Sequence, residues 1–333
     1  MPLVVAAPDK FRGTLSAPEA ARAIAAGAAR AGWECLCVPV SDGGEGFLDS
    51  FESAGTRRYV EVTGPLGRRV RAPWAHVPSA RLAVVESAQV VGLALAGGAQ
   101  ANDPVGATTK GVGELVAFAA REGASEILVG LGGSATTDGG WGAVEVLARR
   151  DPRPRIVVAC DVQARFAEAA TVFARQKGAT PSQVELLRRR LDRLAQLYRD
   201  RFGVDVSAVP GAGAAGGLAG GLLALGAQLV PGFDVVADQL GLAEVVAGAD
   251  LVITGEGYLD DQSFAGKAVG GVCALAAGAG VPVWVLCGDG DPERLGEQRV
   301  SLTGAFGRER ALTETAQCLS RLVTDLLGEA PPS

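Results

Sequence analysis

Lysines are the residues whose type and surroundings most directly suggest chemistry in this sequence. Only four of the 31 basic residues are lysines, and each lies in a glycine-bearing segment. A lysine ammonium is a compact point charge, whereas a guanidinium is a broad planar fork, so lysine suits places where a small cation must fit beside a phosphate. The plainer alternative is four surface lysines with chance glycine neighbours. The four are Lys10, Lys110, Lys177 and Lys267, and the case for a function is clearer for Lys10 and Lys267.

Acidic residues follow several of the apolar runs that predict strands. In doubly wound sheets ligands bind beyond the carboxyl ends of the strands, where carboxylates can hold Mg²⁺ or accept the proton of an attacking hydroxyl. The single histidine, His76, lies in a proline-flanked segment and is expected to be structural, so a carboxylate base is the economical choice. The alternative for each candidate acid is a structural role, since helix caps and turns also attract acidic residues. The candidates are Asp9, Asp42, Glu45, Glu256 and Asp260.

Two glycine-rich segments can bring backbone amides close to a phosphate. GLGGSATTDGGWG, residues 130–142, follows an apolar run and precedes a predicted helix, whose first N–H groups favour anions. GAGAAGG, residues 211–217, contains G-x-G-x-x-G, but Pro210 precedes it and Asp234, the acid at dinucleotide spacing, follows Pro-Gly-Phe. A Rossmann dinucleotide site is therefore disfavoured, and no Walker A motif is present. These features indicate a phosphate-handling α/β enzyme without naming its substrate.

Length and composition limit the classes of protein that remain. The 333 residues correspond to about two domains of roughly 150 residues. A content of 48% hydrophobic and 20% charged residues excludes disorder and small disulfide scaffolds, and a net charge of −6 argues against nucleic-acid or anionic-membrane partners. Six cysteines without Cys-x-x-Cys spacing argue against a zinc site and fit a reducing compartment. With no signal-peptide core or membrane span, we expect a soluble, cytoplasmic protein.

The two ends of the chain predict one sheet. LVVAAPD predicts a buried strand, the capping-box spacing of Ser16 and Glu19 predicts a helix to about Ala31, and CLCVPV predicts a second strand with Cys35 and Cys37 on one face. Near the C-terminus, ADLVITGEG, VPVWVLCGDGD and a weaker run at 300–303 predict three more strands. Helices are expected at 266–277 and 309–327. Right-handed crossovers then favour a five-stranded doubly wound parallel sheet.

The middle of the chain follows a different pattern. VEVTGPLGRRVRAPWAHV and ARLAVVESA alternate and carry turn signals, which predicts a mixed sheet. Helices are predicted at 112–121, 141–149 and 181–202, the last of them arginine-rich and expected to be a solvated outer face. We therefore expect an α/β fold in which a doubly wound, flavodoxin-like or Rossmann-like domain (1–58 plus 235–333) carries an inserted α/β mixed-sheet domain (59–234).

The same segments resemble the bacterial glycerate kinase family, the type with an APDxFKG signature near the N-terminus. The matches keep family order and cover nearly the whole chain. They are APDKFRGTLSAPEAA (7–21), SDGGEG (41–46), VTGPLG (62–67), ESAQVVGLAL (86–95), TTKGVGEL (108–115), VGLGGSATTDGG (129–140), ACDV (159–162), RQKGAT (175–180), PGAGAAGGL (210–218) and ADLVITGEGYLDDQSFAGKAVG (249–270).

The resemblance implies ATP-dependent phosphorylation of D-glycerate with Mg²⁺ by a two-domain enzyme. On this basis Asp42 and Asp260 are the candidates for the base or the metal ligands, and Lys10 and Lys267 for the catalytic cations. The remaining candidates for holding glycerate are Asp9, Glu45, Glu256 and Lys177. Those for holding the nucleotide or its phosphates are Gly132, Gly133, Ser134, Asp138, Gly211, Gly213, Gly216 and Gly217.

The sequence also departs from the family pattern. Only ARRDPRPR separates the helix after DGG from ACDV, where family members usually carry a longer connection, and QARFAEAATVF replaces their Asn-Pro-Leu segment. Two alternatives therefore stay open. The first is a kinase of another small hydroxy acid or sugar, and the second is a non-catalytic relative that binds nucleotide or glycerate without turnover.

Overall fold

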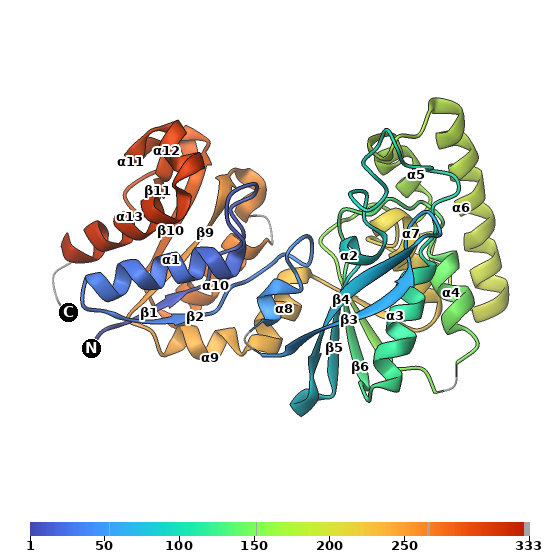
Figure 1. The fold of residues 1–333 in the computed structure, drawn as a ribbon, viewed down its shortest axis with the longest axis horizontal. Helices are drawn as coiled ribbons and strands as arrows, with labels where there is room; N and C mark the ends of the chain where they lie inside the picture. The colour runs from blue at the N-terminus through green and yellow to red at the C-terminus, as the bar shows by residue number, and fades with distance from the viewer. Residues whose placement is uncertain (53, 151, 265–266, 330–333) are drawn as a thin grey trace. The chain divides into compact units, whose positions relative to one another are not determined.

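The computed structural model describes residues 1–52, 54–150, 152–264 and 267–329 and divides the chain into two compact units (Figure 1). Unit 1 contains residues 1–42 and 233–333, and unit 2 contains residues 43–232. The expected first junction lay at 58/59, whereas the structure places it at 42/43. The reason is packing: the Phe47 ring lies against Gly130, where an added Cβ would come within 2.5 Å of it.

Unit 1 is built on a parallel five-stranded sheet of order β11-β10-β9-β1-β2, as the sequence predicts. Its central strand β9 is buried over its first five residues, which is typical of a parallel strand covered on both faces. The strands are β1 (Leu3–Ala6), β2 (Glu34–Cys37), β9 (Leu251–Leu259), β10 (Val283–Gly290) and β11 (Arg299–Ser301). The helices are α1 (Ala17–Arg30), α8 (Gly232–Leu240), α9 (Leu242–Ala247), α10 (Ala268–Ala279), α11 (Leu302–Phe306), α12 (Arg308–Thr313) and α13 (Thr315–Glu329).

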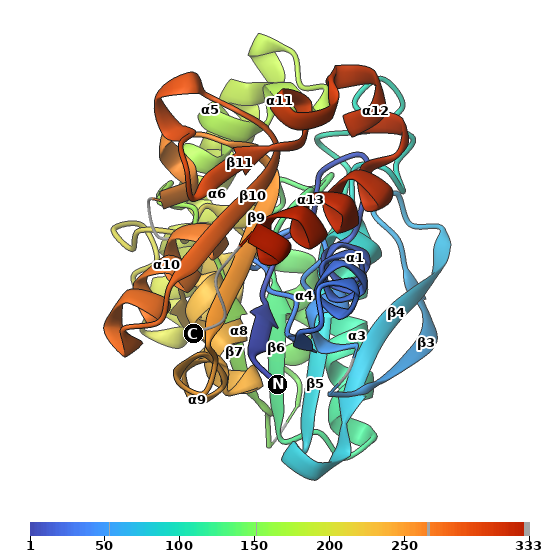
Figure 2. The same cartoon turned by 90° about the vertical axis from the view of Figure 1, so that its left-hand side faces the viewer.

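Helix α1 starts at the predicted capping box, with the Ser16 and Glu19 side chains each accepting from the other residue's backbone N–H. The helix is rich in alanine and carries a glycine at position 27, which permits close packing. An added Cβ at Gly27 would lie 2.4 Å from the Ser320 carbonyl oxygen on α13. Figure 2 shows α1 and α13 side by side. Their apolar faces and those of β1 and β9 form one core.

Two predictions near the C-terminus need correction. The strand expected at 300–303 ends at Ser301, because the Ser301 Oγ accepts from the Gly304 N–H at 2.9 Å and caps α11. The single helix expected at 309–327 is two helices, α12 and α13, which meet at Glu314. The helix expected at 266–277 is α10; Gly266 lies outside the described residues.

Unit 2 has a six-stranded mixed sheet of order β3-β4-β5-β6-β7-β8, which confirms the mixed sheet expected there. The pairs β3–β4 and β4–β5 are antiparallel, and the later pairs are parallel. The strands are β3 (Thr56–Thr63), β4 (Arg69–Val77), β5 (Leu82–Glu86), β6 (Glu126–Gly130), β7 (Arg155–Ala159) and β8 (Gln228–Val230). The helices are α2 (Ala88–Val91), α3 (Lys110–Arg121), α4 (Trp141–Leu147), α5 (Glu168–Phe173), α6 (Pro181–Phe202) and α7 (Ala214–Ala224).

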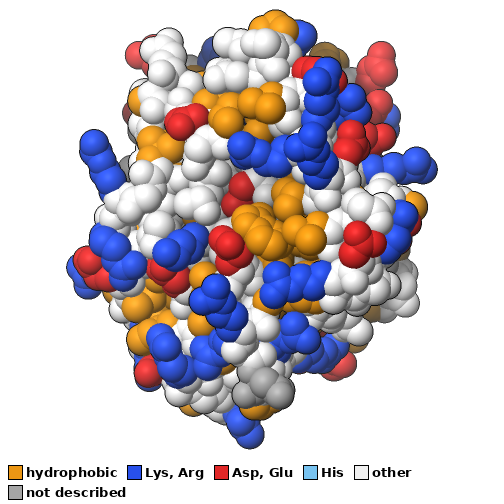
Figure 3. Space-filling view, turned by 90° about the vertical axis from the view of Figure 1, so that its right-hand side faces the viewer, with side chains coloured by type: hydrophobic (Ala, Val, Ile, Leu, Met, Phe, Trp, Pro, Cys, Tyr) orange, Lys and Arg blue, Asp and Glu red, His pale blue; other side chains and the backbone are white. Residues whose placement is uncertain are grey.

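Helix α6 is the arginine-rich helix expected to face solvent. A second capping box, formed by Thr180 and Gln183, begins it. Arg188 pairs with Glu185 at 3.0 Å and with Asp192 at 2.8 Å, so part of the helix's positive charge is balanced by its own acids. Basic, acidic and apolar side chains are interspersed on the face drawn in Figure 3. Across the described part of the chain, no helix combines the length and apolar character that crossing a membrane requires.

Candidate active site

A cavity of about 300 Å³ in unit 1 collects charged side chains and is named here the charged cavity. It lies where β1, β2 and β9 end and α10 begins, which is the edge at which doubly wound sheets bind ligands. All four residues that the sequence predicts as catalytic line it. The lining is Asp9, Lys10, Arg12, Asp42, Glu256, Gly257, Tyr258, Asp260, Lys267, Ala268 and Val269.

Backbone hydrogen bonds, a side-chain cap and a helix start position these residues. The Asp9 N–H donates to the Gly255 carbonyl oxygen at 2.8 Å, which continues the β1–β9 alignment past the end of β1. Asp260 and Ser263 cap each other: the Asp260 N–H donates to the Ser263 Oγ and the Ser263 N–H to the Asp260 Oδ1, both at 3.0 Å. Lys267 is the N-cap of α10, so this lysine stands at the positive end of a helix dipole.

Burial is the largest influence on the pKa of Asp9 and of Glu256 in this cavity. Burial raises the pKa of Asp9 to about 7, the Lys10 ammonium opposes the rise, and Asp42 and Glu256 add to it. The Lys10 Nζ lies 3.8 Å from the Asp9 Oδ1. Burial also raises the pKa of Glu256, against the hydrogen bond from Ser263 and the charge of Lys267. These mutual influences show that the acids and lysines act on one another within one cavity.

Asp9 should make the stability of the protein pH-dependent. Its folded-state pKa lies above its unfolded value, so its contribution is fully present below about pH 4 and is lost as the pH rises through 7. In Asp9→Asn we expect that loss, of up to about 4 kcal/mol, to disappear. Urea unfolding at pH 5 and pH 8 in the presence of EDTA captures about 3 kcal/mol of it, because part of the contribution is already lost between pH 4 and pH 5. An equal pH effect in both proteins would contradict the shifted pKa.

The charged cavity also fits a magnesium ion. Its carboxylates offer the oxygen ligands that Mg²⁺ takes, and the Glu256 Oε1 is a buried atom with no hydrogen-bond partner among the described residues. Within those residues no set of three or more Asp, Glu, His or Cys side chains is arranged to enclose a metal ion. Mg²⁺ usually takes one or two protein carboxylates together with water and substrate phosphates. Asp42 and Asp260 remain the candidates.

Unit 2 contains a second cavity, of about 350 Å³, named here the apolar cavity. The Lys177 side chain lies at its wall, where the Nζ donates to the Ser134 Oγ at 2.9 Å and to the Thr136 carbonyl oxygen at 2.7 Å. Burial lowers the pKa of Lys177 to about 8, and Asp138 opposes this. Lys177, expected from the family resemblance to hold glycerate, thus lies beside the glycine-serine loop. The lining is Leu93, Leu131, Gly132, Gly133, Ser134, Val162, Phe173, Gln176, Lys177 and Ala215.

Asp138, expected to hold nucleotide or phosphate, is buried, and its carboxylate oxygens already accept hydrogen bonds from the protein. Its Oδ2 accepts from the Thr109 N–H and Oγ1, both at 2.8 Å, and from the Gly142 N–H at 3.2 Å. Its Oδ1 accepts from the Gly140 N–H at 3.1 Å. Burial raises the pKa of this carboxyl, and these hydrogen bonds oppose the rise. The geometry favours a role in shaping the loop instead of the direct ligand contact expected from sequence.

The glycines of the 211–217 segment are required by backbone packing. An added Cβ at Gly216 would lie 1.9 Å from the Thr136 carbonyl oxygen, and one at Gly213 would lie 2.3 Å from the Arg165 carbonyl oxygen. Gly217 is similarly close to the backbone of Gly139, and Gly211 has a φ of +84°. This segment contributes Ala215 to the lining of the apolar cavity. Close packing therefore accounts for the G-x-G-x-x-G spacing.

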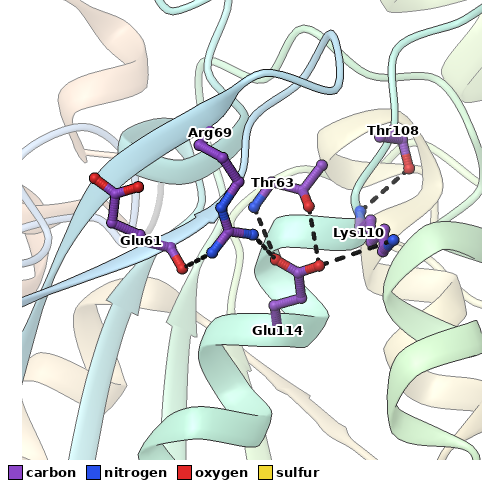
Figure 4. A network of polar contacts seen from close by, with 6 residues as sticks. All are labelled: Glu61, Thr63, Arg69, Thr108, Lys110 and Glu114. Atoms are coloured by element: carbon purple, nitrogen blue, oxygen red, sulfur yellow. Dashed lines mark hydrogen bonds and ion pairs between the residues drawn. The ribbon is translucent and has the colours of Figure 1, made fainter.

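Lys110 and Glu45 line neither the charged cavity nor the apolar cavity. Figure 4 shows Lys110 beside Glu114 on α3, with the Nζ 3.9 Å from the Oε1. Glu114 also accepts from the Thr63 N–H and Oγ1 at 2.8 and 2.9 Å and from Arg69, which ties the β3–β4 hairpin to α3. Lys110 thus belongs to a structural network on the surface of unit 2. Glu45 is exposed and belongs to unit 2, whereas Asp42, three residues earlier, belongs to unit 1.

Some lining residues were not predicted. Arg12 and Tyr258 line the charged cavity, and both sit in segments already singled out, so proximity to Lys10 and Glu256 was the available signal. Leu93, Val162 and Phe173 line the apolar cavity but come from three separate segments. No local spacing connects them, since only the packing of unit 2 brings them together.

Comparison with known proteins gives a consistent result. The model of the "Glycerate kinase family" matches residues 4–151 and 147–329, two matches that overlap at residues 147–151. The glycerate 2-kinase of Escherichia coli K12 is 38% identical over 323 residues, covering 86% of this chain and 84% of the relative. The glycerate kinase of Bacillus subtilis 168 is 35% identical over 368 residues, covering 97% and 96%.

A solved structure agrees over the whole chain. The crystal structure of a putative glycerate kinase 2 from Salmonella typhimurium LT2 superposes with a TM-score of 0.84 at 33% identity, covering 98% of this chain and 97% of the other. The match extends over both α/β units. Together with the family model, it shows that this chain belongs to the glycerate kinase family.

Proposed function

We propose that this protein is a glycerate kinase that transfers the γ-phosphoryl group of ATP to D-glycerate with the help of Mg²⁺. The observation that carries the proposal is the charged cavity, in which Lys10 and Lys267 line the same space as Asp42 and Asp260. Family membership supports the reaction class. The six cysteines are free thiols, in keeping with a cytoplasmic location.

The cations of the charged cavity serve the transferring phosphoryl group. Phosphoryl transfer depends mainly on positioning and on neutralising the charge of the moving group. Lys10 and Lys267 supply two ammonium groups, and Ala268 and Val269, at the first turn of α10, bring a helix N-terminus to the same cavity. Helix N-termini favour phosphate through their N–H groups and dipole. These features hold the phosphoryl group during transfer.

The carboxylates of the cavity serve the acceptor. A glycerate hydroxyl oxygen forms the new bond to the γ-phosphorus while the bond from that phosphorus to the ADP oxygen breaks. Asp42 or Asp260 takes the hydroxyl proton, and Asp9 and Glu256 hydrogen-bond the remaining polar groups of glycerate. Whichever of Asp42 and Asp260 does not take the proton would hold Mg²⁺, which would neutralise phosphate charge. Ser263 keeps the Asp260 carboxylate oriented through its 3.0 Å hydrogen bond.

An ADP-release assay with ATP and D-glycerate tests the proposal, run beside L-glycerate, other small hydroxy acids and sugars. We expect release with D-glycerate that depends on Mg²⁺. Direct coupling to enolase detects 2-phosphoglycerate, whereas a requirement for mutase indicates the 3-phosphate. Faster release with another acceptor would favour a kinase of that compound. Calorimetric binding of ATP or glycerate without ADP release would favour a non-catalytic relative.

A further inference from the structure

We propose that Arg12 binds the carboxylate of the acceptor at the edge of the charged cavity, and that it thereby makes the enzyme select hydroxy acids over neutral polyols. This inference rests on the proposed function and adds to it the group that recognises the anionic end of glycerate. In the proposed function, Lys10 and Lys267 serve the phosphoryl group. Asp42 and Asp260 serve the hydroxyl proton and Mg²⁺. The acceptor carboxylate is thus left without a cation of its own.

The charges of the cavity explain why an anionic acceptor needs such a cation. Among the described residues, four acids and three basic residues line it, so a carboxylate that enters is repelled by the acids that are ionised. The Lys10 Nζ already lies 3.8 Å from the Asp9 Oδ1. The charge of Lys267 stabilises the ionised form of Glu256. Arg12 is the third basic residue, and its side chain makes no hydrogen bond or ion pair with any residue that the structure describes.

A tight turn fixes the backbone at Arg12. The Thr14 N–H donates to the Phe11 carbonyl oxygen at 2.9 Å, and Gly13 has a φ of +83°, which the third position of such a turn reserves for glycine. Strand β9 packs against the same turn, since an added Cβ at Gly257 would lie 2.7 Å from the Arg12 backbone nitrogen. The Arg12 side chain is exposed, but it starts from a fixed point of the lining. Binding therefore has less freedom to remove than at a mobile loop.

The chemistry of a guanidinium matches a carboxylate. Its planar fork of N–H groups can donate to both carboxylate oxygens at once, through two parallel charge-assisted hydrogen bonds, and it stays charged at any ordinary pH. Arg308 is not equivalent, because it lines a smaller, adjoining cavity of about 190 Å³ and lies 3.8 Å from Asp289 in an ion pair. A guanidinium also binds phosphate, so the experiment has to separate the acceptor from the donor.

Arg12→Met tests the inference, because it removes the fork and keeps an unbranched side chain. We expect the KM for D-glycerate to rise at least about tenfold, the scale of losing hydrogen bonds to a charged group. The kcat should stay within about threefold, since binding that is equal in the ground state and the transition state changes KM alone. ADP release at saturating ATP measures both constants. The matched control is Arg321→Met on α13, an exposed arginine of unit 1 that pairs with Asp325 and lines neither cavity, and it should behave as the wild type does.

A neutral acceptor gives a reading that a merely structural role of Arg12 would not change. D-Glyceramide keeps both hydroxyl groups of D-glycerate and replaces the carboxylate with an uncharged amide. In the wild type its kcat/KM should be at least about tenfold lower than that of D-glycerate. In Arg12→Met its kcat/KM should stay within about threefold of the wild-type value, so the preference for the acid shrinks or disappears. Arg12→Lys keeps the charge without the fork, and its preference should lie between the two.

The outcomes separate this inference from the proposed function. If Arg12→Met raises the KM for ATP and leaves that for D-glycerate unchanged, Arg12 serves the phosphates and the inference is wrong. Equal losses with D-glycerate and D-glyceramide also overturn it, and thermal unfolding shows whether each variant is folded. If the wild type phosphorylates no acceptor, the function fails, and calorimetry with D-glycerate alone still tests the inference. Binding to the wild type that Arg12→Met weakens would support it, whereas equal binding, or none to the wild type, would overturn it.

Discussion

Lys267→Ala is expected to lower the kcat of glycerate phosphorylation at least about a hundredfold. Lys267 lines the charged cavity and stands at the N-cap of α10, so its ammonium adds to the positive end of the helix where the phosphoryl group is proposed to lie. Removing one group that stabilises transition-state charge typically costs about a hundredfold to a thousandfold. Asp42→Asn should have an effect of the same size, through loss of a base or metal ligand of the same cavity.

Steady-state ADP release with ATP and D-glycerate measures both variants. Lys110→Ala is the control, because Lys110 is more than half exposed and pairs with Glu114 on the surface of α3. It should keep kcat within about twofold of the wild type, the scale expected from a surface pair worth well under 1 kcal/mol. Near-normal turnover in both Lys267→Ala and Asp42→Asn would refute the assignment of the active site to the charged cavity.

Asp138→Ala is expected to lower the free energy of unfolding by about 3–5 kcal/mol. The substitution removes the acceptor of the N–H groups of Thr109, Gly140 and Gly142, all of which are buried. A buried donor left without a partner costs about 1–3 kcal/mol. Three such donors account for the expected loss, less whatever relaxation or entering water recovers.

Urea unfolding followed by circular dichroism measures this change. Asp138→Asn is the informative comparison, because its one carbonyl oxygen still accepts from part of the set, and its loss should be smaller. Ser182→Ala, on the exposed first turn of α6, serves as a surface control. A loss below about 1 kcal/mol in Asp138→Ala would show that the loop does not depend on this carboxylate.

Local patterns predicted much of the fold. The capping box predicted at Ser16 begins α1, since a cap is a local interaction that the spacing of two residues determines. Apolar runs predicted the five parallel strands of unit 1, most directly β1 and β9, because buried strands are apolar along their length. The features that the sequence did not predict depend on packing between residues that are far apart along the chain. The junction at 42/43 depends on Phe47 meeting Gly130, which are far apart in sequence.

The sequence also predicted many of the residues of the candidate active site. Strand ends pointed to Asp9, Asp42 and Asp260, and the structure brings them into one cavity with Lys10 and Lys267. Their individual roles stay predictions. Asp138 could not be separated from a ligand-binding residue by sequence, because its partner Thr109 lies 29 residues away. Sequence singled out Lys177 and the glycine-serine loop of the apolar cavity, but not its apolar walls, since Leu93, Val162 and Phe173 come from three separate segments.

The scarcity of lysine makes this protein well suited to amine footprinting. Lys110 has a side chain that is 55% exposed, that of Lys10 is 15% exposed, and Lys177 is almost fully covered. A limiting amount of acylating reagent should therefore modify Lys110 well before Lys177. Peptide mass spectrometry with and without nucleotide or glycerate would then report, at a handful of amines, which ligand shields which part of the molecule.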